Sequence, residues 1–245
     1  MSFSLTGLSF LFGAVSIGML AFRFFQYWQE EKNTTSKLFF WFTSMFPIFM
    51  LFVAIGSLFF ADNAQILKLT VVLATFFQGI ACSIIGYMIF YIKFPSVSPW
   101  WGAIPIFLLS MVATFSSLFL SYSPHLEPDG GINWDIPLSL GIIRSILFLI
   151  TFLPLILILI QQIKSSSDAF VRTKAFGLSI VLIFGIIMGF LDFFLETVLG
   201  LSAISSAIAL IFLSIIVFFM IFITQKAPKK QKDETSTPSS PQISW

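Results

Sequence analysis

The chain has 245 residues, of which 58% are hydrophobic and only 10% are charged, and its formal net charge is +2. Soluble globular domains carry about 25% charged residues, so this chain has too few charges to cover a surface that faces water. The composition excludes an ordinary soluble domain and predicts an all-α, polytopic membrane bundle whose main partner is the lipid bilayer. With no basic face in the sequence, we expect no nucleic-acid partner.

Seven apolar segments are each at least 21 residues long, and about 20 residues suffice to cross the hydrocarbon core of a bilayer. They cover residues 5–25, 38–61, 69–92, 101–122, 136–160, 175–198 and 201–224. Only Leu199 and Gly200 separate the last two segments, which requires a tight helical hairpin, and Gly200 suits the left-handed position at its turn. We therefore predict a seven-helix transmembrane domain over residues 1–225 and a disordered tail, rich in Ser and Pro, over residues 226–245.

The distribution of Lys and Arg predicts the orientation of the bundle. With the N-terminus outside, only Lys68 lies on the outer side and Arg144 lies within the fifth span. The other eleven basic residues then lie on the inner side: Arg23, Lys32, Lys37, Lys93, Lys164, Arg172, Lys174, Lys226, Lys229, Lys230 and Lys232. Because basic residues concentrate on the cytoplasmic side, the N-terminus is predicted outside and the C-terminus inside, in the plasma (inner) membrane.

The ends of the spans carry further signals for membrane and loop. Tryptophan favours the headgroup level, and the chain places Trp28, Trp41, Trp100 and Trp101 at predicted inner ends and Trp134 at an outer end.

The longest outer loop covers residues 123–135, contains three acidic residues and no Lys or Arg, and ends at Asp135, a candidate cap for the fifth span. Lys226, Lys229, Lys230 and Lys232 follow the last span, where we expect them to attract anionic lipid.

Three charged residues lie inside the predicted spans: Arg144, Asp192 and Glu196. At about 1.5 Å per residue, Arg144 lies roughly 10 Å below the outer end of its span, and Asp192 and Glu196 lie roughly 12 and 6 Å below theirs. Charges inside a membrane are costly and by default indicate a functional site. We therefore expect Arg144 to meet Asp192 in the outer half of the bundle.

Gly185, Gly189, Asp192 and Glu196 form one stripe of the sixth span, because their spacing keeps them on a single helix face. A G-x-x-x-G pair permits close helix contact, so we expect the stripe to face the bundle interior. Two main interpretations remain open. Arg144 and Asp192 neutralise each other and fix helix packing, or the three charges line an outward-opening cavity that binds a small ligand, a cation or a proton. In a third interpretation, Glu196 reaches the headgroups and Asp192 pairs elsewhere.

A second polar stripe lies on the third span and contains Thr75, Gln78, Cys82 and Gly86. Gln78 lies near the middle of the membrane, where we expect its amide to hydrogen bond a neighbouring helix. The alternative is a cavity-lining role, in which the amide supplies both a donor and an acceptor to a ligand.

Motifs for catalysis and metal binding are missing from the sequence. The chain has one Cys and one His, and no cluster of His, Cys, Asp and Glu has the spacing of metal ligands. No Gly-rich phosphate loop and no Ser-His-Asp or Cys-His set is present. We expect a protein that is not an enzyme and that uses neither a cofactor nor a metal.

Residues 172–224 read RTKAFGLSIVLIFGIIMGFLDFFLETVLGLSAISSAIALIFLSIIVFFMIFIT. This segment resembles part of the seven-helix sensor region at the N-terminus of some bacterial histidine kinases. The shared features are a basic R-x-K, a long apolar segment, a short outer turn and a last span that is followed by basic residues. The resemblance extends over about 220 residues in hydropathy and implies a signal-input module. The sequence departs from that family after the seventh span, because only about 20 residues follow and they contain no kinase domain. The output would therefore belong to a partner protein.

Three functions are compatible with these patterns. The first is a receptor-like bundle of bacterial type that senses a small ligand or a membrane property in its outer half, near Arg144, Asp192, Glu196 and Gln78. The second is a small transporter that uses Asp192 and Glu196 for a solute, cation or proton. The third is a structural membrane subunit in which the charges only hold helices together. A polar path to the inner side would favour transport, and a closed outer pocket would favour sensing.

Overall fold

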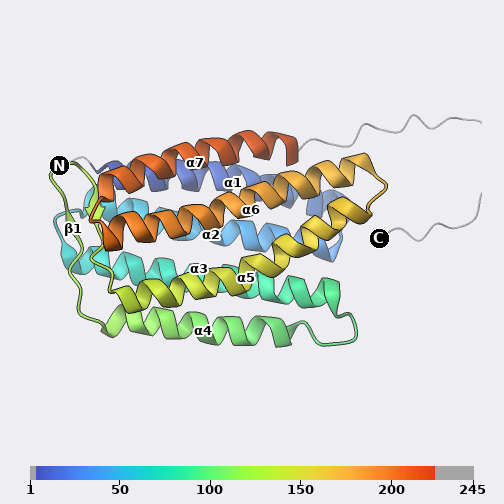
Figure 1. The fold of residues 1–245 in the computed structure, drawn as a ribbon, viewed down its shortest axis with the longest axis horizontal. Helices are drawn as coiled ribbons and strands as arrows, with labels where there is room; N and C mark the ends of the chain where they lie inside the picture. Colours follow the sequence, from blue (N-terminus) through green and yellow to red (C-terminus); the bar gives the residue numbers. More distant parts are fainter. Residues whose placement is uncertain (1–3, 224–245) are drawn as a thin grey trace, which may run out of the picture.

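The computed structural model describes residues 4–223, except for the side chains of residues 31, 170, 192–193, 196–197, 213–214 and 217–223. Seven helices fill most of this part of the chain (Figure 1). Their bounds are α1 Leu5–Glu31, α2 Thr34–Phe59, α3 Ala64–Lys93, α4 Trp100–Phe119, α5 Leu138–Ser165, α6 Ala169–Phe193 and α7 Ser202–Ile223. The prediction of an all-helical bundle is confirmed.

Six of the helices, α1 to α6, are long and apolar enough to cross a membrane. In hydrocarbon every backbone N–H and C=O must find its partner within the protein, and a helix provides all of them internally. Free N–H groups at three helix starts are also satisfied, because Ser4, Asn33 and Asn63 accept hydrogen bonds from the first turns of α1, α2 and α3. The chain is a multi-pass helical membrane protein.

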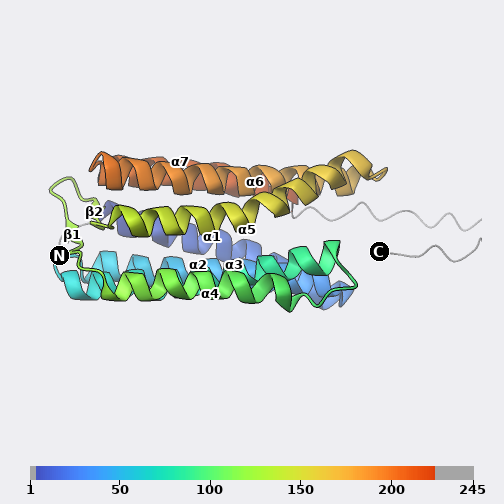
Figure 2. The same ribbon diagram turned by 60° about the horizontal axis from the view of Figure 1, so that its bottom comes forward.

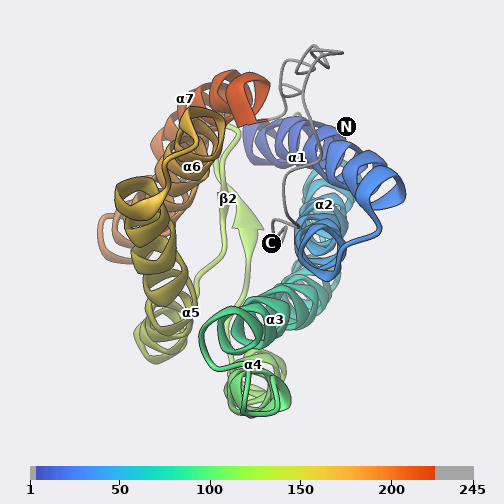
Figure 3. The ribbon, with the colours of Figure 1, turned by 90° about the vertical axis from the view of Figure 1, so that its right-hand side faces the viewer.

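The helices are arranged as a ring with one helix outside it (Figure 3). Helices that follow each other in sequence pack together, and α1 packs against α7 to close the ring. Helix α4 lies on the outside and packs against both α3 and α5, which also contact each other. Figure 2 shows α6 and α7 on one side of the bundle and α2, α3 and α4 on the other, with α5 between them.

The two ends of the bundle differ in their connections. One end carries the starts of α1, α3, α5 and α7 and a short β-hairpin, in which β1 (His125–Leu126) pairs antiparallel with β2 (Ile132–Asn133). We call it the hairpin end. The opposite end carries seven basic residues, and we call it the basic end: Arg23, Lys32, Lys37, Lys93, Lys164, Arg172 and Lys174.

The tight connection between α6 and α7 follows the prediction. Helix α6 continues into one π-helical turn, η1 (Phe194–Val198), and α7 begins at Ser202. Between them, Gly200 has a φ of 65°. This left-handed conformation is open to glycine at little cost, so Gly200 allows the chain to reverse within a few residues.

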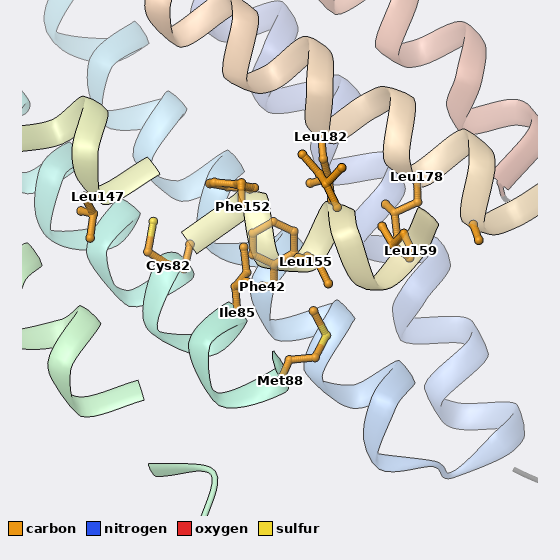
Figure 4. Close-up of a cluster of buried hydrophobic side chains, with 13 residues drawn as sticks. Phe42, Cys82, Ile85, Met88, Leu147, Phe152, Leu155, Leu159, Leu178 and Leu182 are labelled. Atoms are coloured by element: carbon orange, nitrogen blue, oxygen red, sulfur yellow. The ribbon is translucent and has the colours of Figure 1, made fainter. Parts of the chain in front are cut away.

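Two apolar clusters form most of the interior, one in each half. The larger reaches from mid-bundle toward the basic end and includes Ile85 and Met88 of α3, Phe152 and Leu155 of α5 and Leu178 of α6 (Figure 4). The smaller lies at the hairpin end and consists of Val53, Ala61, Leu67, Val71, Ala74, Ile132 and Trp134. Residues of the β-hairpin segment therefore belong to the core of the hairpin end.

Glycine packing differs from the prediction. A Cβ atom added at Gly185 or Gly189 would meet nothing within 4 Å, and both residues are exposed, so this pair packs against no other helix of the described chain. The close contact between glycines is instead between α3 and α4. There, a Cβ at Gly86 would lie 2.5 Å from the carbonyl oxygen of Gly102, and a Cβ at Gly102 would overlap the carbonyl oxygen of Gly86. Their spacing does place Gly185 and Gly189 on one face of α6, but this face is exposed, whereas the prediction turned it toward the bundle interior.

Two further expectations about the outer loop are wrong. Trp134 is only 6% exposed and packs in the core of the hairpin end instead of at the lipid headgroups, because the loop folds back into the ring. Asp135 does not cap α5, whose N-cap residue is Pro137. Its carboxylate accepts a hydrogen bond from the backbone N–H of Ser123 at 3.1 Å and so closes the base of the loop.

Candidate functional site

Arg144 lies on α5 near the hairpin end, between one and two turns after the helix begins at Leu138. Its Nη2 donates to Thr75 Oγ1 of α3 at 2.5 Å and to Ser117 Oγ of α4 at 3.1 Å. Thr75 and Ser117 are themselves buried. The guanidinium is therefore held in a fixed place between three helices, at the junction where α4 joins the ring.

A second cation lies above Arg144, toward the membrane surface. Lys68 Nζ donates to the backbone oxygen of Leu120 at 2.7 Å, and the ammonium lies 4.9 Å from the ring centroid of Tyr122. Leu120 directly follows α4, so this bond satisfies one carbonyl at the negative end of that helix. The cation–π contact fixes the ammonium above the aromatic ring.

Tyr122 links the two cations. Burial raises the pKa of its phenol above the ordinary value, and the nearby positive charge of Arg144 acts in the opposite direction. The phenol oxygen is buried and makes no hydrogen bond within the described residues. Lys68 contacts Tyr122 directly, and Arg144 acts on Tyr122 through its charge. We call these three residues the outer cation cluster, because the sequence predicts that this end of the bundle lies outside.

Three matched pairs of side chains join α3 to α5 at different depths. These two helices run in the same direction, so residues at a constant separation lie at the same depth. Thr75 lies against Arg144 and Cys82 against Thr151, both 69 positions apart, and Lys93 Nζ donates to Gln161 Oε1, 68 positions apart. The pairs extend from the hairpin end to the basic end, and the register differs by one residue at the last pair.

The β-hairpin fixes the other side of the hairpin end. The backbone N–H of Leu5 donates to Gly130 O at 2.8 Å, and that of Ile132 donates to Thr6 Oγ1 at 2.9 Å. The hydroxyls of Thr6 and Ser206 are 2.7 Å apart, which joins α1 to α7. The hairpin therefore closes the ring where its first and last helices meet, and it carries Ile132 into the core.

Of the other predicted site residues, the structure describes the side chain of Gln78 but not those of Asp192 and Glu196. Asp192 and Glu196 lie on the described backbone, but their side chains are outside the described part, so the predicted pair of Arg144 with Asp192 stays a prediction. Gln78 lies seven residues from both Val71 and Ile85, which are buried, so it shares their inward face. Its amide makes no hydrogen bond among the described residues, so the expected contact with a neighbouring helix is not found there. Lys226, Lys229, Lys230 and Lys232 lie outside the described residues.

Two surface hollows of the described part of the chain lie on the outside of the bundle. One, of about 420 Å³, lies along the outer face of α4 and is lined by Val112, Phe115, Ser116, Phe119 and Leu120. The other lies on α1 at the basic end and is lined by Phe22, Arg23, Phe25, Gln26, Gln29 and Glu30. Neither hollow includes Arg144 or Gln78. Within the described residues, no group of three or more His, Cys, Asp and Glu side chains has the arrangement of a metal site.

Sequence reasoning missed Ser117, Lys68 and Tyr122. Ser117 is one of several small hydroxyl residues of α4, and nothing in its spacing distinguishes it from Ser110 or Thr114. Lys68 carried a signal, since it is the one basic residue that the predicted orientation leaves in an outer connection. Such an isolated cation is a reason to search for a partner nearby.

Comparison with known proteins adds no identification. No family model, no curated protein and no solved structure matches this chain.

Proposed function

We propose that the chain is a receptor-like, signal-input bundle of a bacterial plasma membrane, which responds at its hairpin end to a small ligand or to the state of the membrane. The observation that carries the proposal is the position of Arg144. A charged side chain at this depth is costly, and here hydroxyls of two other helices hold it in place. A force on the guanidinium therefore acts on α3, α4 and α5 together.

The orientation of the proposed receptor is N-terminus outside, with seven membrane spans. In support, the basic end carries seven Lys and Arg residues in the described chain, and the hairpin end carries Lys68 and Arg144. This asymmetry favours a cytoplasmic basic end and an external hairpin end.

Transmission of the signal follows from the matched pairs between α3 and α5. Small axial shifts of one packed helix against another are a common form of switching. A shift of α5 that starts at Arg144 would be carried along these pairs to Lys93 and Gln161 at the basic end. The output would then belong to a partner at the cytoplasmic face, in keeping with the resemblance of this chain to the sensor regions of histidine kinases.

Transport by Asp192 and Glu196, or a purely structural role, remains the alternative. The apolar cluster toward the basic end argues against a continuous polar path, because its members fill the contacts among α2, α3, α5 and α6. A structural role would make Arg144 important for stability alone. The two roles differ in whether a change at Arg144 is felt at the other end of the bundle.

The test is hydrogen exchange of the full chain in phosphatidylcholine nanodiscs, comparing Thr75→Val with Thr114→Val. Both threonines are buried and donate to their own helix backbone, but only Thr75 also contacts Arg144. We expect Thr75→Val to weaken protection at residues 159–165, near the basic end of α5, by up to about fivefold, which corresponds to about 1 kcal/mol. Thr114→Val should leave these amides unchanged.

Two results would reject the proposal. The first is a loss of protection in Thr75→Val that stays within a turn or two of Thr75, since that would indicate a local structural contact. The second is proton or cation flux through vesicles containing the wild-type chain that Asp192→Asn abolishes, which would favour transport.

A further inference from the structure

We propose that the outer cation cluster and the adjoining hollow on α4 bind one anionic phospholipid of the outer leaflet. The phosphate would lie against Lys68, and an acyl chain would lie along α4. This inference rests on the proposed function, whose ligand it names.

The headgroup contact would come from the Lys68 ammonium. An ammonium has three N–H donors, and among the described residues one of them is taken, by Leu120 O. The ring of Tyr122 holds the ammonium from one side without using a donor. Lys68 is only partly buried, so the remaining donors have access to an acceptor from outside the protein.

The acyl chain would occupy the hollow of about 420 Å³ on α4. Val112, Phe115 and Phe119 are 53%, 55% and 78% exposed along this face. The hollow ends at Leu120, the same residue whose carbonyl oxygen holds Lys68. The apolar hollow thus ends at a residue that contacts a cation, which is the order of groups in a phospholipid read from its chain end to its phosphate.

The two cations beside the hollow favour one class of lipid. Arg144 and Lys68 are two positive charges on this side of the hairpin end, Arg144 held by Thr75 and Ser117 and Lys68 by Leu120 and the ring of Tyr122. Three acidic residues of the 123–135 loop make contacts within the loop. Glu127 contacts His125 and Asn133, Asp129 accepts a hydrogen bond from Gly131, and Asp135 accepts one from Ser123. A zwitterionic headgroup adds a positive charge beside Lys68, so an anionic lipid should bind more tightly.

Native mass spectrometry of the full chain tests this proposal, with phosphatidylglycerol and phosphatidylcholine of the same acyl chains as probes. We expect one phosphatidylglycerol to bind more tightly than phosphatidylcholine. Lys68→Gln should weaken phosphatidylglycerol binding about fivefold and leave phosphatidylcholine unchanged. Lys93→Gln is the matched control, because this lysine also holds a single oxygen acceptor but lies at the basic end.

Lys68→Arg keeps the charge and should retain the preference, which separates lipid binding from a loss of folding in Lys68→Gln. An equal loss of phosphatidylglycerol binding in Lys68→Gln and Lys93→Gln would indicate diffuse electrostatic attraction and overturn the proposal. No loss of binding in either variant would also overturn it, and Lys68 would then only cap α4. Displacement of the lipid by glycerol phosphate at equal concentration would assign the site to a free phosphate compound. Because the exchange experiment on Thr75→Val uses phosphatidylcholine alone, its outcome is independent of this one.

Discussion

The hairpin end and the basic end of the bundle use different means to hold the same helices together. Toward the basic end, α2, α3, α5 and α6 meet through a large apolar cluster. At the hairpin end, the apolar cluster is smaller, and hydrogen bonds supplement it. Those of Thr75 and Ser117 join α3 and α4 to α5, and that of Thr6 joins α1 to the β-hairpin.

The difference indicates where the molecule can respond to its surroundings. Apolar packing in lipid is non-directional and changes little with a ligand or a charge. Hydrogen bonds to a buried cation have a defined geometry and depend on charge, so a bound anion can alter them. Under the proposed receptor function, a signal would enter at the hairpin end and be passed on through the half that contains the larger apolar cluster.

The largest expected effect of a single substitution is at Trp134, which tests whether the hairpin is part of the core. Trp134→Ala should lower the free energy of unfolding by about 3–5 kcal/mol, because it removes a side chain that is 6% exposed and leaves a cavity. Trp101→Ala is the control, since Trp101 is 70% exposed. Chemical unfolding in mixed micelles gives both values, and equal losses would show that Trp134 contributes no more than a lipid-facing ring.

A smaller effect is expected where α3 crosses α4, toward the basic end. Gly86→Ala places a methyl group against the carbonyl oxygen of Gly102, and the two backbones must separate. Overpacking of this kind costs about 1–3 kcal/mol, measurable in the same unfolding experiment.

Gly189→Ala is the matched control for Gly86→Ala. A Cβ there meets nothing within 4 Å, and alanine favours the helix over glycine by up to about 1 kcal/mol. Stability should therefore be unchanged or slightly raised. A clear loss in Gly189→Ala, together with none in Gly86→Ala, would restore the packing face that the sequence suggested.

Much of the fold was predictable because the signals for membrane helices are local. Hydropathy alone located the helices, and Gly200 indicated the turn between α6 and α7. The inward face of α3 was also found, since Thr75, Cys82 and Gly86 contact α5 or α4. Each of these inferences needs only a short stretch of sequence.

The remaining errors depend on contacts between distant segments. Spacing places Gly185 and Gly189 on one face of α6, but an almost uniformly apolar helix does not show which of its faces is inside. Trp134 follows the rule for tryptophan at span ends only if its loop stays at the surface, and this loop folds into the ring. At the candidate site, Arg144 was identified from its charge, whereas the role of Ser117 became visible only once α4 was placed beside it.

The measurement that tests the central claim most directly is the side of the membrane on which each end lies. Ser123→Cys and Ser167→Cys place one exposed thiol at the hairpin end and one at the basic end, and the native Cys82 is buried and should stay unlabelled. A membrane-impermeant maleimide applied to intact cells should label position 123 at once and position 167 only after permeabilisation. Labelling of position 167 in intact cells, with position 123 protected, would place the outer cation cluster in the cytoplasm and contradict a receptor that senses from outside.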